Sequence, residues 1–152
     1  GLMITEDGPK LIEYNCRFGD PETQILMRRM RSDIVAPLWA AATGRLSGVN
    51  IDWMDEAAAN IVMATKGYPE AYEKGSEIRG LNDAKNLPGV EIFHAGTKQD
   101  GEKVLANGGR VLNVTATGAS LKEALDNAYA AIDAIDWPQG FCRRDIGQSH
   151  RG

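Results

Sequence analysis

Hydrophobic and polar positions alternate along residues 10–18, close to the start of the chain. A short apolar stretch, Leu2–Ile4, precedes the turn-like run Glu6-Asp7-Gly8-Pro9. Side chains two residues apart in a strand share a face, so the stretch that follows the turn sorts into two faces. The pattern predicts a β-hairpin whose return strand runs from Lys10 to about Phe18. Its apolar face holds Ile12, Tyr14, Cys16 and Phe18, and its polar face holds Leu11, Glu13, Asn15 and Arg17.

Two helical segments are predicted to follow the hairpin. Asp20 has the side chain of a good N-cap, and Pro21 suits the first helical position. Apolar residues then recur at helical spacing over 25–34. Ser32 is a candidate cap for a second segment, which would end at Gly44, a favoured residue just beyond a helix.

The connection over about residues 44–56 is rich in glycine, asparagine and aspartate, and we take it as the domain boundary. It divides the chain into residues 1–50 and 51–152. The second part begins with strands expected at 59–65 and 90–95. A hairpin is predicted across Asn107-Gly108-Gly109, pairing 103–106 with 110–115, and a last short strand includes Phe141 and Cys142.

The strongest helix signal is the capping box Ser120-Leu121-Lys122-Glu123. An apolar stripe at helical spacing follows it, formed by Leu121, Leu125, Ala128, Ile132 and Ile135. Together these elements predict an α/β (α+β) chain, in which a terminal piece of hairpin and helices precedes a small mixed α+β domain.

Composition and charge narrow the possible partners. The formal net charge is -4 and the sequence pI about 5.2, so no global field attracts nucleic acid or an acidic membrane. The one dense basic cluster, Arg28, Arg29 and Arg31, is interpreted as a solvated helix face. Cys16 and Cys142 have neither disulfide-framework nor metal spacing, and they indicate reduced thiols in a cytoplasmic protein. No apolar run is long enough to span a bilayer.

Glu13, Asn15 and Arg17 form the candidate chemical site, because two-residue steps place their side chains on one strand face, about 7 Å apart. Carboxylate and amide oxygens suit a hard cation such as Mg²⁺, which commonly shares its ligands with nucleotide phosphates. An arginine beside them can hold a carboxylate or a transferring phosphoryl group. Taken alone, the spacing favours an exposed strand face with its charges in water.

The stretch that contains these residues, 12–24, reads IEYNCRFGDPETQ and resembles the signature of the glycinamide ribonucleotide synthetase (phosphoribosylamine–glycine ligase) family of ATP-grasp ligases. The resemblance extends over nearly the whole chain. It implies that residues 1–50 are the C-terminal end of an ATP-grasp domain and residues 51–152 the ligase C-terminal domain. The similar segments outside the motif are 1–5, 66–69, 93–97, 108–115 and 143–147, and the tail after Gly147 departs from the family's usual hydrophobic ending.

The resemblance also implies a reaction. In that family ATP phosphorylates the carboxylate of glycine, and the amine of phosphoribosylamine attacks the glycyl phosphate. The products are glycinamide ribonucleotide, ADP and phosphate, in de novo purine synthesis. Glu13 and Asn15 match the family's Mg²⁺ (or Mn²⁺) ligands, and Arg17 matches an arginine near the transferring groups. Asp20 and Glu22 are candidates for supporting positions only.

Several parts that the chemistry needs are not found in this sequence. It has no Gly-rich phosphate loop followed by lysine, and no earlier strand offers a second metal-binding carboxylate. Because the hairpin begins at Gly1 with nothing before it to pack against, we expect an amino-terminal part of the same ligase to precede it and the chain alone to be inactive. The alternatives are a non-catalytic binding or scaffolding module and another ATP-grasp enzyme such as a carboxylase subunit. The run RFGDPE argues against the carboxylase subunit.

Other residues with chemical potential have simpler interpretations. His94 is expected to be a hydrogen-bonded structural histidine. The three tryptophans are expected to serve packing, because no basic residues are interleaved with them. For Arg143 and Arg144 two roles remain equally open: they contact a substrate, or they cover the surface of the domain.

Overall fold

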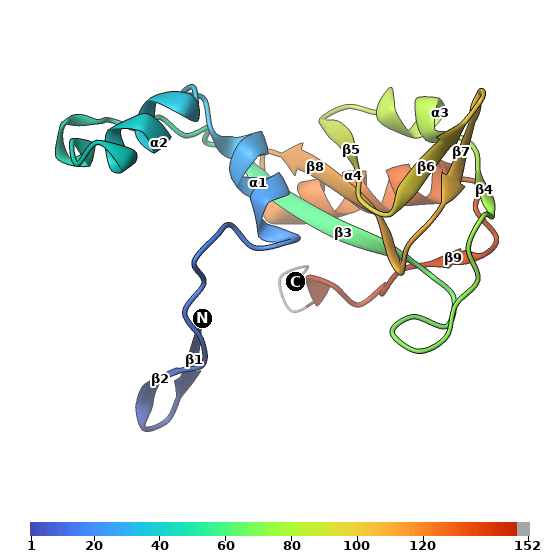
Figure 1. The fold of residues 1–152 in the computed structure, drawn as a ribbon, viewed down its shortest axis with the longest axis horizontal. Coiled ribbons are helices and arrows are strands. Elements are labelled where there is room, and N and C mark those ends of the chain that lie inside the picture. Colours follow the sequence, from blue (N-terminus) through green and yellow to red (C-terminus); the bar gives the residue numbers. More distant parts are fainter. Residues whose placement is uncertain (149–152) are drawn as a thin grey trace.

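The computed structural model describes residues 1–148, and Figure 1 shows an arm, a helical segment and a layered body. Residues 149–152, which hold most of the tail that departs from the family's ending, lie outside the described residues. The elements are β1 (Leu2–Thr5), β2 (Gly8–Leu11), α1 (Glu22–Arg29), α2 (Val35–Ala42), the 3-10 helix η1 (Leu46–Gly48), β3 (Ala57–Thr65), β4 (Glu77–Ile78), α3 (Leu81–Lys85), β5 (Val90–His94), β6 (Thr97–Asp100), β7 (Lys103–Ala106), β8 (Arg110–Gly118), α4 (Leu121–Ala134) and β9 (Gly140–Phe141).

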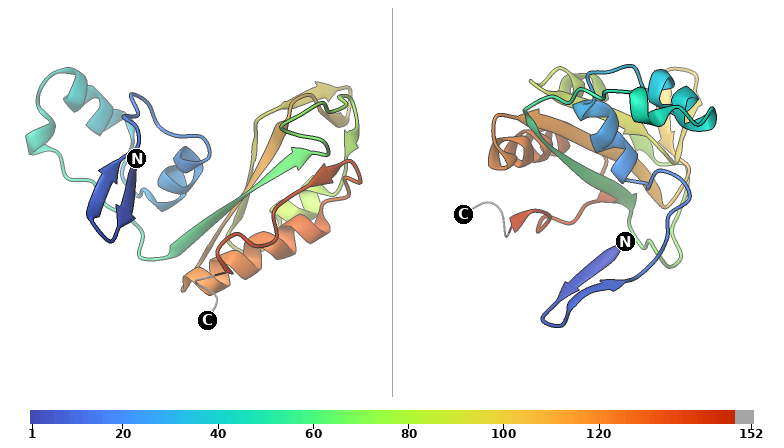
Figure 2. Two further views of the ribbon diagram at one scale, coloured as in Figure 1. Left: turned by 90° about the horizontal axis from the view of Figure 1, so that it is seen from below. Right: turned by 90° about the vertical axis from the view of Figure 1, so that its left-hand side faces the viewer.

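The body is built on an antiparallel sheet with the strand order β5-β8-β3-β9. Side chains alternate between its two faces, and one face packs against α4 while α1 lies in front of the other (Figure 1). The view from below in Figure 2 shows α4 running along this sheet. The side chains between the sheet and α4 form the core, which includes Ile61, Met63, Leu112, Val114 and Leu125.

The predicted start of α4 is confirmed. Ser120 Oγ accepts a hydrogen bond from the backbone N of Glu123 at 3.2 Å, and Glu123 Oε2 accepts one from the backbone N of Ala119 at 2.8 Å. The carboxylate thus reaches one residue further back than in the usual reciprocal box. The apolar stripe is also confirmed, with Leu121 half-buried and Leu125, Ala128, Ile132 and Ile135 buried.

A second, smaller sheet has the order β4-β7-β6, and it shows that the predicted pairing of 103–106 with 110–115 is wrong. β7 pairs with β6 across a turn in which Gly101 has a φ of 58°. The chain then crosses to the central sheet, where β8 lies between β5 and β3. Gly108 is needed at this crossing rather than in a hairpin turn, because a Cβ there would lie 3.0 Å from the Cα of Gly96.

The arm is the predicted hairpin, with a shorter return strand than expected. β1 pairs with β2 from Leu2 opposite Leu11 to Thr5 opposite Gly8. Just beyond Leu11 the backbone still pairs with Gly1, since Gly1 O accepts hydrogen bonds from Ile12 N and Glu13 N at 2.9 and 3.5 Å. The prediction that a strand continues to Phe18 is therefore wrong, because residues 14–18 pair with no strand in the part of the chain that the structure describes.

The two predicted helical segments are present, but neither predicted N-cap is. α1 has no side-chain cap, and the carboxylate of Asp20 contacts the body instead. Ser32 Oγ accepts a hydrogen bond from Asp52 N at 2.8 Å, while Asp33 Oδ1 accepts the one from Val35 N at the start of α2. Gly44 follows α2 with a φ of 69°, which confirms its predicted place beyond the helix end.

The basic cluster is only partly a solvated face. Arg28 Nη2 donates to Gly89 O at 3.3 Å, and Arg29 donates to the carbonyl oxygens of Met54 and Glu56. Arg31 is exposed, as expected. The interpretation of all three arginines as solvated is therefore wrong for Arg28 and Arg29, which tie α1 to the body.

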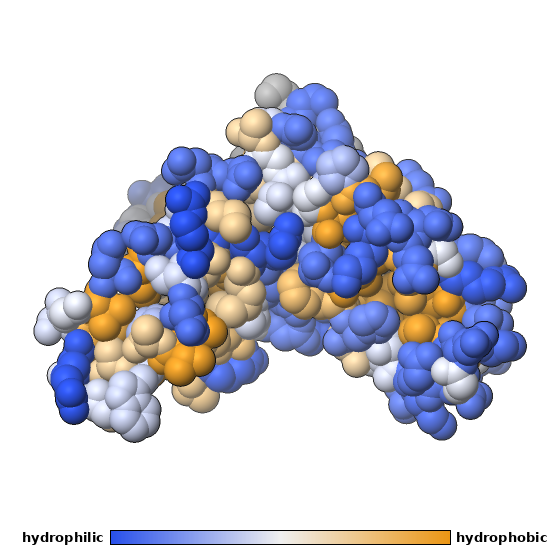
Figure 3. Space-filling model, turned by 90° about the horizontal axis from the view of Figure 1, so that it is seen from above, coloured by the Kyte–Doolittle hydropathy of each residue, from blue (hydrophilic) through white to orange (hydrophobic). Residues whose placement is uncertain are grey.

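Large apolar side chains are exposed mainly in the arm and around α2. Ile4 is 76% exposed, Tyr14 88% and Trp39 68%. Figure 3 shows apolar surface at the end of the molecule that α2 forms. None of the helices within residues 1–148 has both the length and the apolar composition that crossing a membrane requires.

Candidate functional site

Glu13 and Asn15 lie together on the arm just beyond β2. Asn15 Nδ2 donates a hydrogen bond to Glu13 Oε1 at 3.3 Å, and both side chains are exposed. The amino group of Gly1 donates to Glu13 O at 2.8 Å and fixes the backbone at this point. The two side chains therefore meet, whereas strand geometry predicted a separation of about 7 Å, because the segment that carries them is not a paired strand.

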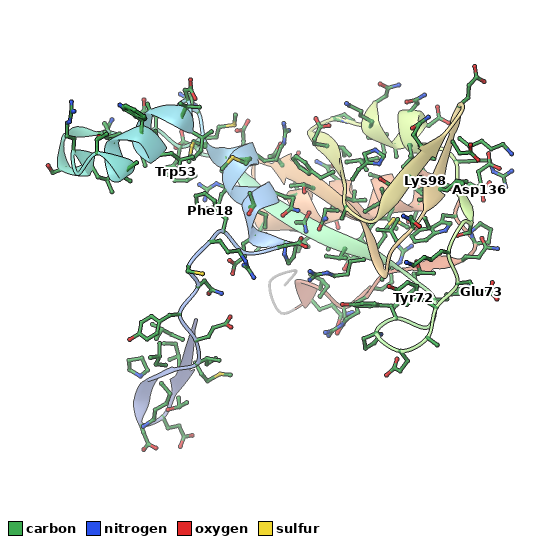
Figure 4. All side chains as sticks on the ribbon, viewed as in Figure 1. Phe18, Trp53, Tyr72, Glu73, Lys98 and Asp136 are labelled. Atoms are coloured by element: carbon green, nitrogen blue, oxygen red, sulfur yellow. The ribbon has the colours of Figure 1, made fainter. Side chains whose placement is uncertain are left out.

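Arg17 is not brought to this pair. Its guanidinium donates from Nη1 to the carbonyl oxygen of Phe18 at 3.0 Å. Phe18 lies where the arm meets the body (Figure 4). Two of the three predicted site residues are thus in contact, and the third binds the backbone at the root of the arm.

A tight turn joins the arm to α1. The backbone N and the Oγ1 of Thr23 both donate to Gly19 O, at 2.9 and 2.8 Å. Gly19 is buried, and a Cβ at this position would lie 2.1 Å from Glu22 Oε2. A glycine at position 19 thus leaves room for the Glu22 side chain, and the run Gly19-Asp20-Pro21-Glu22-Thr23 builds the turn.

Asp20 connects this turn to the body through Arg110, the first residue of β8. Arg110 Nη2 donates to Asp20 Oδ2 at 2.9 Å, and Arg110 Nη1 donates to Asp20 O at 3.2 Å. The other carboxylate oxygen, Asp20 Oδ1, lies 3.5 Å from Gln24 Nε2 in α1. Sequence reasoning missed Arg110, because its partner lies 90 residues away and no local pattern marks it.

A cavity of about 550 Å³ opens beside this contact. Its walls are mainly apolar, and they come from the turn, from β3 and from the segment after β9. Two arginines lie in the wall, Arg110 and Arg143, and each is already paired with a carboxylate. The lining also includes Pro21, Val62, Tyr68, Phe141 and Cys142.

Both arginines near the carboxyl end form ion pairs at the surface. Arg143 Nε donates to Asp145 Oδ1 at 3.0 Å, and this bond lowers the pKa of the Asp145 carboxyl below its ordinary value. Arg144 pairs with Asp133, and its guanidinium carbon lies 5.6 Å from the centre of the Tyr129 ring. The structure therefore places both on the domain surface, with Arg143 also in the cavity wall.

Cys142, in the same wall, is half-buried, whereas Cys16 on the arm is exposed. Burial raises the pKa of the Cys142 thiol above its ordinary value, against the opposing influence of the nearby Arg144 charge. Burial thus disfavours the thiolate form of Cys142.

The remaining predicted roles are partly confirmed. His94 is hydrogen-bonded, with its Nδ1 3.1 Å from Thr97 Oγ1, and it is exposed on the rim of a second cavity of about 660 Å³ between β4, α3 and β6. Trp137 is a packing residue, buried and donating from Nε1 to Ser76 Oγ at 2.9 Å. Trp39 and Trp53 are exposed, so the packing interpretation is wrong for them in this chain.

The donor atoms of Glu13 and Asn15 fit a divalent cation that is shared with other ligands. Both residues carry hard oxygens, the kind that Mg²⁺ prefers. Asn15 now presents its amino group to the carboxylate, and a half-turn of the terminal amide would present its oxygen instead. Within residues 1–148 no three His, Cys, Asp or Glu side chains gather as a metal site. The pair therefore suits an ion whose other ligands are phosphate oxygens, water or residues elsewhere.

Comparison with known protein families shows to which family the chain belongs. The family model described as "Phosphoribosylglycinamide synthetase, C domain" matches residues 58–149, and the model of the ATP-grasp (A) domain of the same synthetase matches residues 1–23. The chain belongs to the phosphoribosylglycinamide synthetase family. The resemblance inferred from residues 12–24 and the expected fold class are thereby confirmed. The boundary between residues 50 and 51 stays a prediction.

Relatives of known sequence are named phosphoribosylamine–glycine ligase. The protein from Mesorhizobium japonicum is 61% identical over 97% of this chain and 34% of its own length. The chloroplastic protein from Arabidopsis thaliana is 55% identical over 97% of this chain and 28% of its own length. The chain thus spans about a third of the length of the curated relatives that it matches.

A solved structure of the family has the same fold over most of the chain. The crystal structure of phosphoribosylamine–glycine ligase from Thermotoga maritima matches with a TM-score of 0.72 and 33% sequence identity. The match covers 95% of this chain and 35% of that protein. The layered body and the helices before it therefore follow the architecture of that ligase.

Proposed function

We propose that this chain serves as part of a phosphoribosylamine–glycine ligase, an ATP-dependent enzyme of purine synthesis that acts in the cytoplasm. The observation that carries the proposal is the Glu13–Asn15 contact, which lies inside the segment matched by the ATP-grasp domain. The named relatives support the reaction, and ATP, glycine and phosphoribosylamine are the proposed substrates. An ATP-grasp portion outside these 152 residues would complete the nucleotide site.

In this reaction the chain's residues hold and orient charge. Glu13 and Asn15 would hold Mg²⁺ (or Mn²⁺), which when bound neutralises phosphate charge as the γ-phosphoryl group moves to the glycine carboxylate. The guanidinium of Arg17 carries a delocalised positive charge and several N–H donors, so it can stabilise the anionic oxygens of the reacting groups. To do so, its side chain must leave the carbonyl oxygen of Phe18.

In the proposed reaction Glu13, Asn15 and Arg17 supply only charge and orientation, and the substrates themselves supply every bond that forms or breaks. Phosphoryl transfer breaks the bond between the γ-phosphorus and the β,γ-bridging oxygen and forms a bond to a glycine carboxylate oxygen, with ADP leaving. The amine nitrogen then forms the amide bond and gives up a proton to the leaving phosphate or to water, and phosphate leaves with the electrons of the broken C–O bond. Positioning and charge stabilisation account for nearly all catalysis of such transfers. The partners proposed are therefore small molecules, and neither a nucleic acid nor a membrane has a role.

A chimeric enzyme tests the proposal. The matching third of the Mesorhizobium japonicum ligase is replaced by this chain, and formation of glycinamide ribonucleotide from ATP, glycine and phosphoribosylamine is measured. We expect the chimera to make product and the 152-residue chain alone to make none, because phosphoryl transfer requires the complete clamp around ATP.

The same assay weighs the main alternative. A folded chimera without ligase activity would contradict the proposal and favour a non-catalytic binding or scaffolding module. The unaltered relative is the positive control. A chimera carrying Glu13→Ala separates activity that comes from this chain from contaminating ligase of the expression host.

A further inference from the structure

We propose that Arg110 is a positioning residue, which fixes the position of the Glu13–Arg17 segment relative to the body of the enzyme. The inference rests on the proposed function, because it assigns to Arg110 the placement of that site. Arg110 belongs to β8 of the C-terminal domain, whereas the segment it holds precedes α1. The site would thus depend on a contact between the two parts of the chain.

The contact is made at the root of the arm. Figure 1 shows the arm extending away from the body, joined to it through the turn before α1. Glu13 and Asn15 are exposed and stand on backbone that contacts Gly1 rather than the body. Within residues 1–148, the position of the arm relative to β8 is therefore set largely by the few residues between Phe18 and Glu22.

Arg110 binds this turn through two hydrogen bonds. One guanidinium nitrogen binds the carboxylate of Asp20 at 2.9 Å, and the other binds the backbone carbonyl oxygen of the same residue at 3.2 Å. A two-pronged contact from a planar guanidinium fixes orientation as well as distance. Because one of the two hydrogen bonds is made to the backbone itself, the contact restrains the chain direction three residues after Arg17.

The stability gained from this contact is expected to be small, since both side chains are about half exposed, at 43% and 50%. Exposed ion pairs contribute little to folding, because water already solvates and screens both charges. The catalytic consequence is larger, because a displacement of about 1 Å in a reacting group can cost roughly 10²-fold in rate. A positioning role therefore predicts a large loss of turnover with little loss of stability.

The test uses the active chimera with Arg110→Met, Asp20→Asn and the double variant. We expect Arg110→Met to lower kcat by roughly 10- to 10²-fold, with Tm within about 2 °C of the parent. Arg110→Lys should recover part of the loss, because an ammonium group can replace one of the two hydrogen bonds but not the paired bonds of the planar guanidinium. The double variant should be no slower than the slower single variant, since both changes remove the same contact.

Arg79→Met is the matched control. Arg79 forms an ion pair of similar length with Asp136, 3.0 Å, at an exposed position away from the arm. We expect its kcat to stay within about twofold of the parent, as is usual for exposed surface substitutions. A kcat for Arg110→Met as high as that of the control would overturn the inference. Losses that multiply in the double variant would overturn it as well.

Hydrogen exchange on the 152-residue chain provides a readout that needs no activity. If Arg110 anchors the turn, amides of residues 19–24 should exchange faster in Arg110→Met than in Arg79→Met. Unchanged exchange there contradicts the inference even if the chimera is slow. An inactive parent chimera would contradict the proposed function instead, and in that case the exchange measurement alone decides whether Arg110 holds the turn.

Discussion

The guanidinium of Arg29 donates to the carbonyl oxygen of Met54 at 3.0 Å, and its Nε donates to Glu56 O at 3.1 Å. These two bonds join the end of α1 to the segment that leads into β3. Met30 forms a β-bridge with Trp53 next to them. The connection between the helices and the body is therefore held by side-chain and backbone bonds together.

Replacing Arg29 with alanine is expected to lower the free energy of unfolding by about 1–3 kcal/mol, because two carbonyl groups lose a charged donor. Arg31→Ala is the control, since Arg31 is exposed and its loss should change stability by less than about 0.5 kcal/mol. Urea unfolding of the two variants measures the difference. Equal midpoints would mean that the Arg29 contacts contribute nothing to stability.

These neighbouring arginines show where sequence reasoning reaches its limit. Arg28, Arg29 and Arg31 look alike in the sequence, and a charged cluster is usually solvated. Which of them meets carbonyl groups depends on segments 25 and 61 residues further along the chain. Tertiary placement decides their roles, and no local pattern encodes it.

Local signals predicted their elements well. The cap of α4 depends on Ser120 and Glu123, three residues apart, and it forms as expected. The error over β7 arose because Asn107-Gly108-Gly109 has the composition of a turn, whereas Gly108 allows a close crossing with Gly96 and Gly109 leaves room for the Tyr68 ring. Asp100-Gly101, at the turn that joins β6 to β7, has an equally good turn composition.

The candidate site was predictable from the sequence only in part. The two-residue spacing of Glu13 and Asn15 predicted a shared strand face with side chains about 7 Å apart, whereas the side chains meet at 3.3 Å on a segment beyond β2. The contact of Arg110 with Asp20 was not predictable, since it joins a turn to a strand 90 residues away. Long-range ion pairs of this kind require the fold.

The exposed apolar surface of the arm and α2 predicts that the isolated chain self-associates. Ile4 in β1 and Trp39 in α2 are 76% and 68% exposed, and both edges of the hairpin lack a further strand within residues 1–148. Sedimentation velocity over a range of concentrations should show species larger than a monomer. Ile4→Lys tests the strand edge and Trp39→Lys tests the α2 face. A chain that stays monomeric at high concentration would contradict this prediction.

The two cysteines should differ in reactivity. Burial raises the pKa of the Cys142 thiol, so at pH 8 its thiolate fraction is smaller than that of an unburied thiol. We expect a thiol reagent to modify the exposed Cys16 first, and the rate at Cys142 to keep rising above pH 9. Mass spectrometry of partly labelled protein measures both sites, and unfolded protein serves as the control. Faster labelling of Cys142 in the folded chain would show that its surroundings are not as described.

A Mg²⁺ titration of turnover in the chimera tests most directly whether Glu13 and Asn15 hold the divalent ion of a ligase. Glu13→Gln keeps the size of the side chain and removes its charge, so we expect turnover to fall by ~10²–10³-fold and extra Mg²⁺ to restore part of it. Asn15→Ala should act in the same direction but more mildly. Glu6→Gln, the same change in the hairpin turn of the same arm, should leave the titration unchanged. Parental turnover and parental Mg²⁺ dependence in Glu13→Gln would contradict the account.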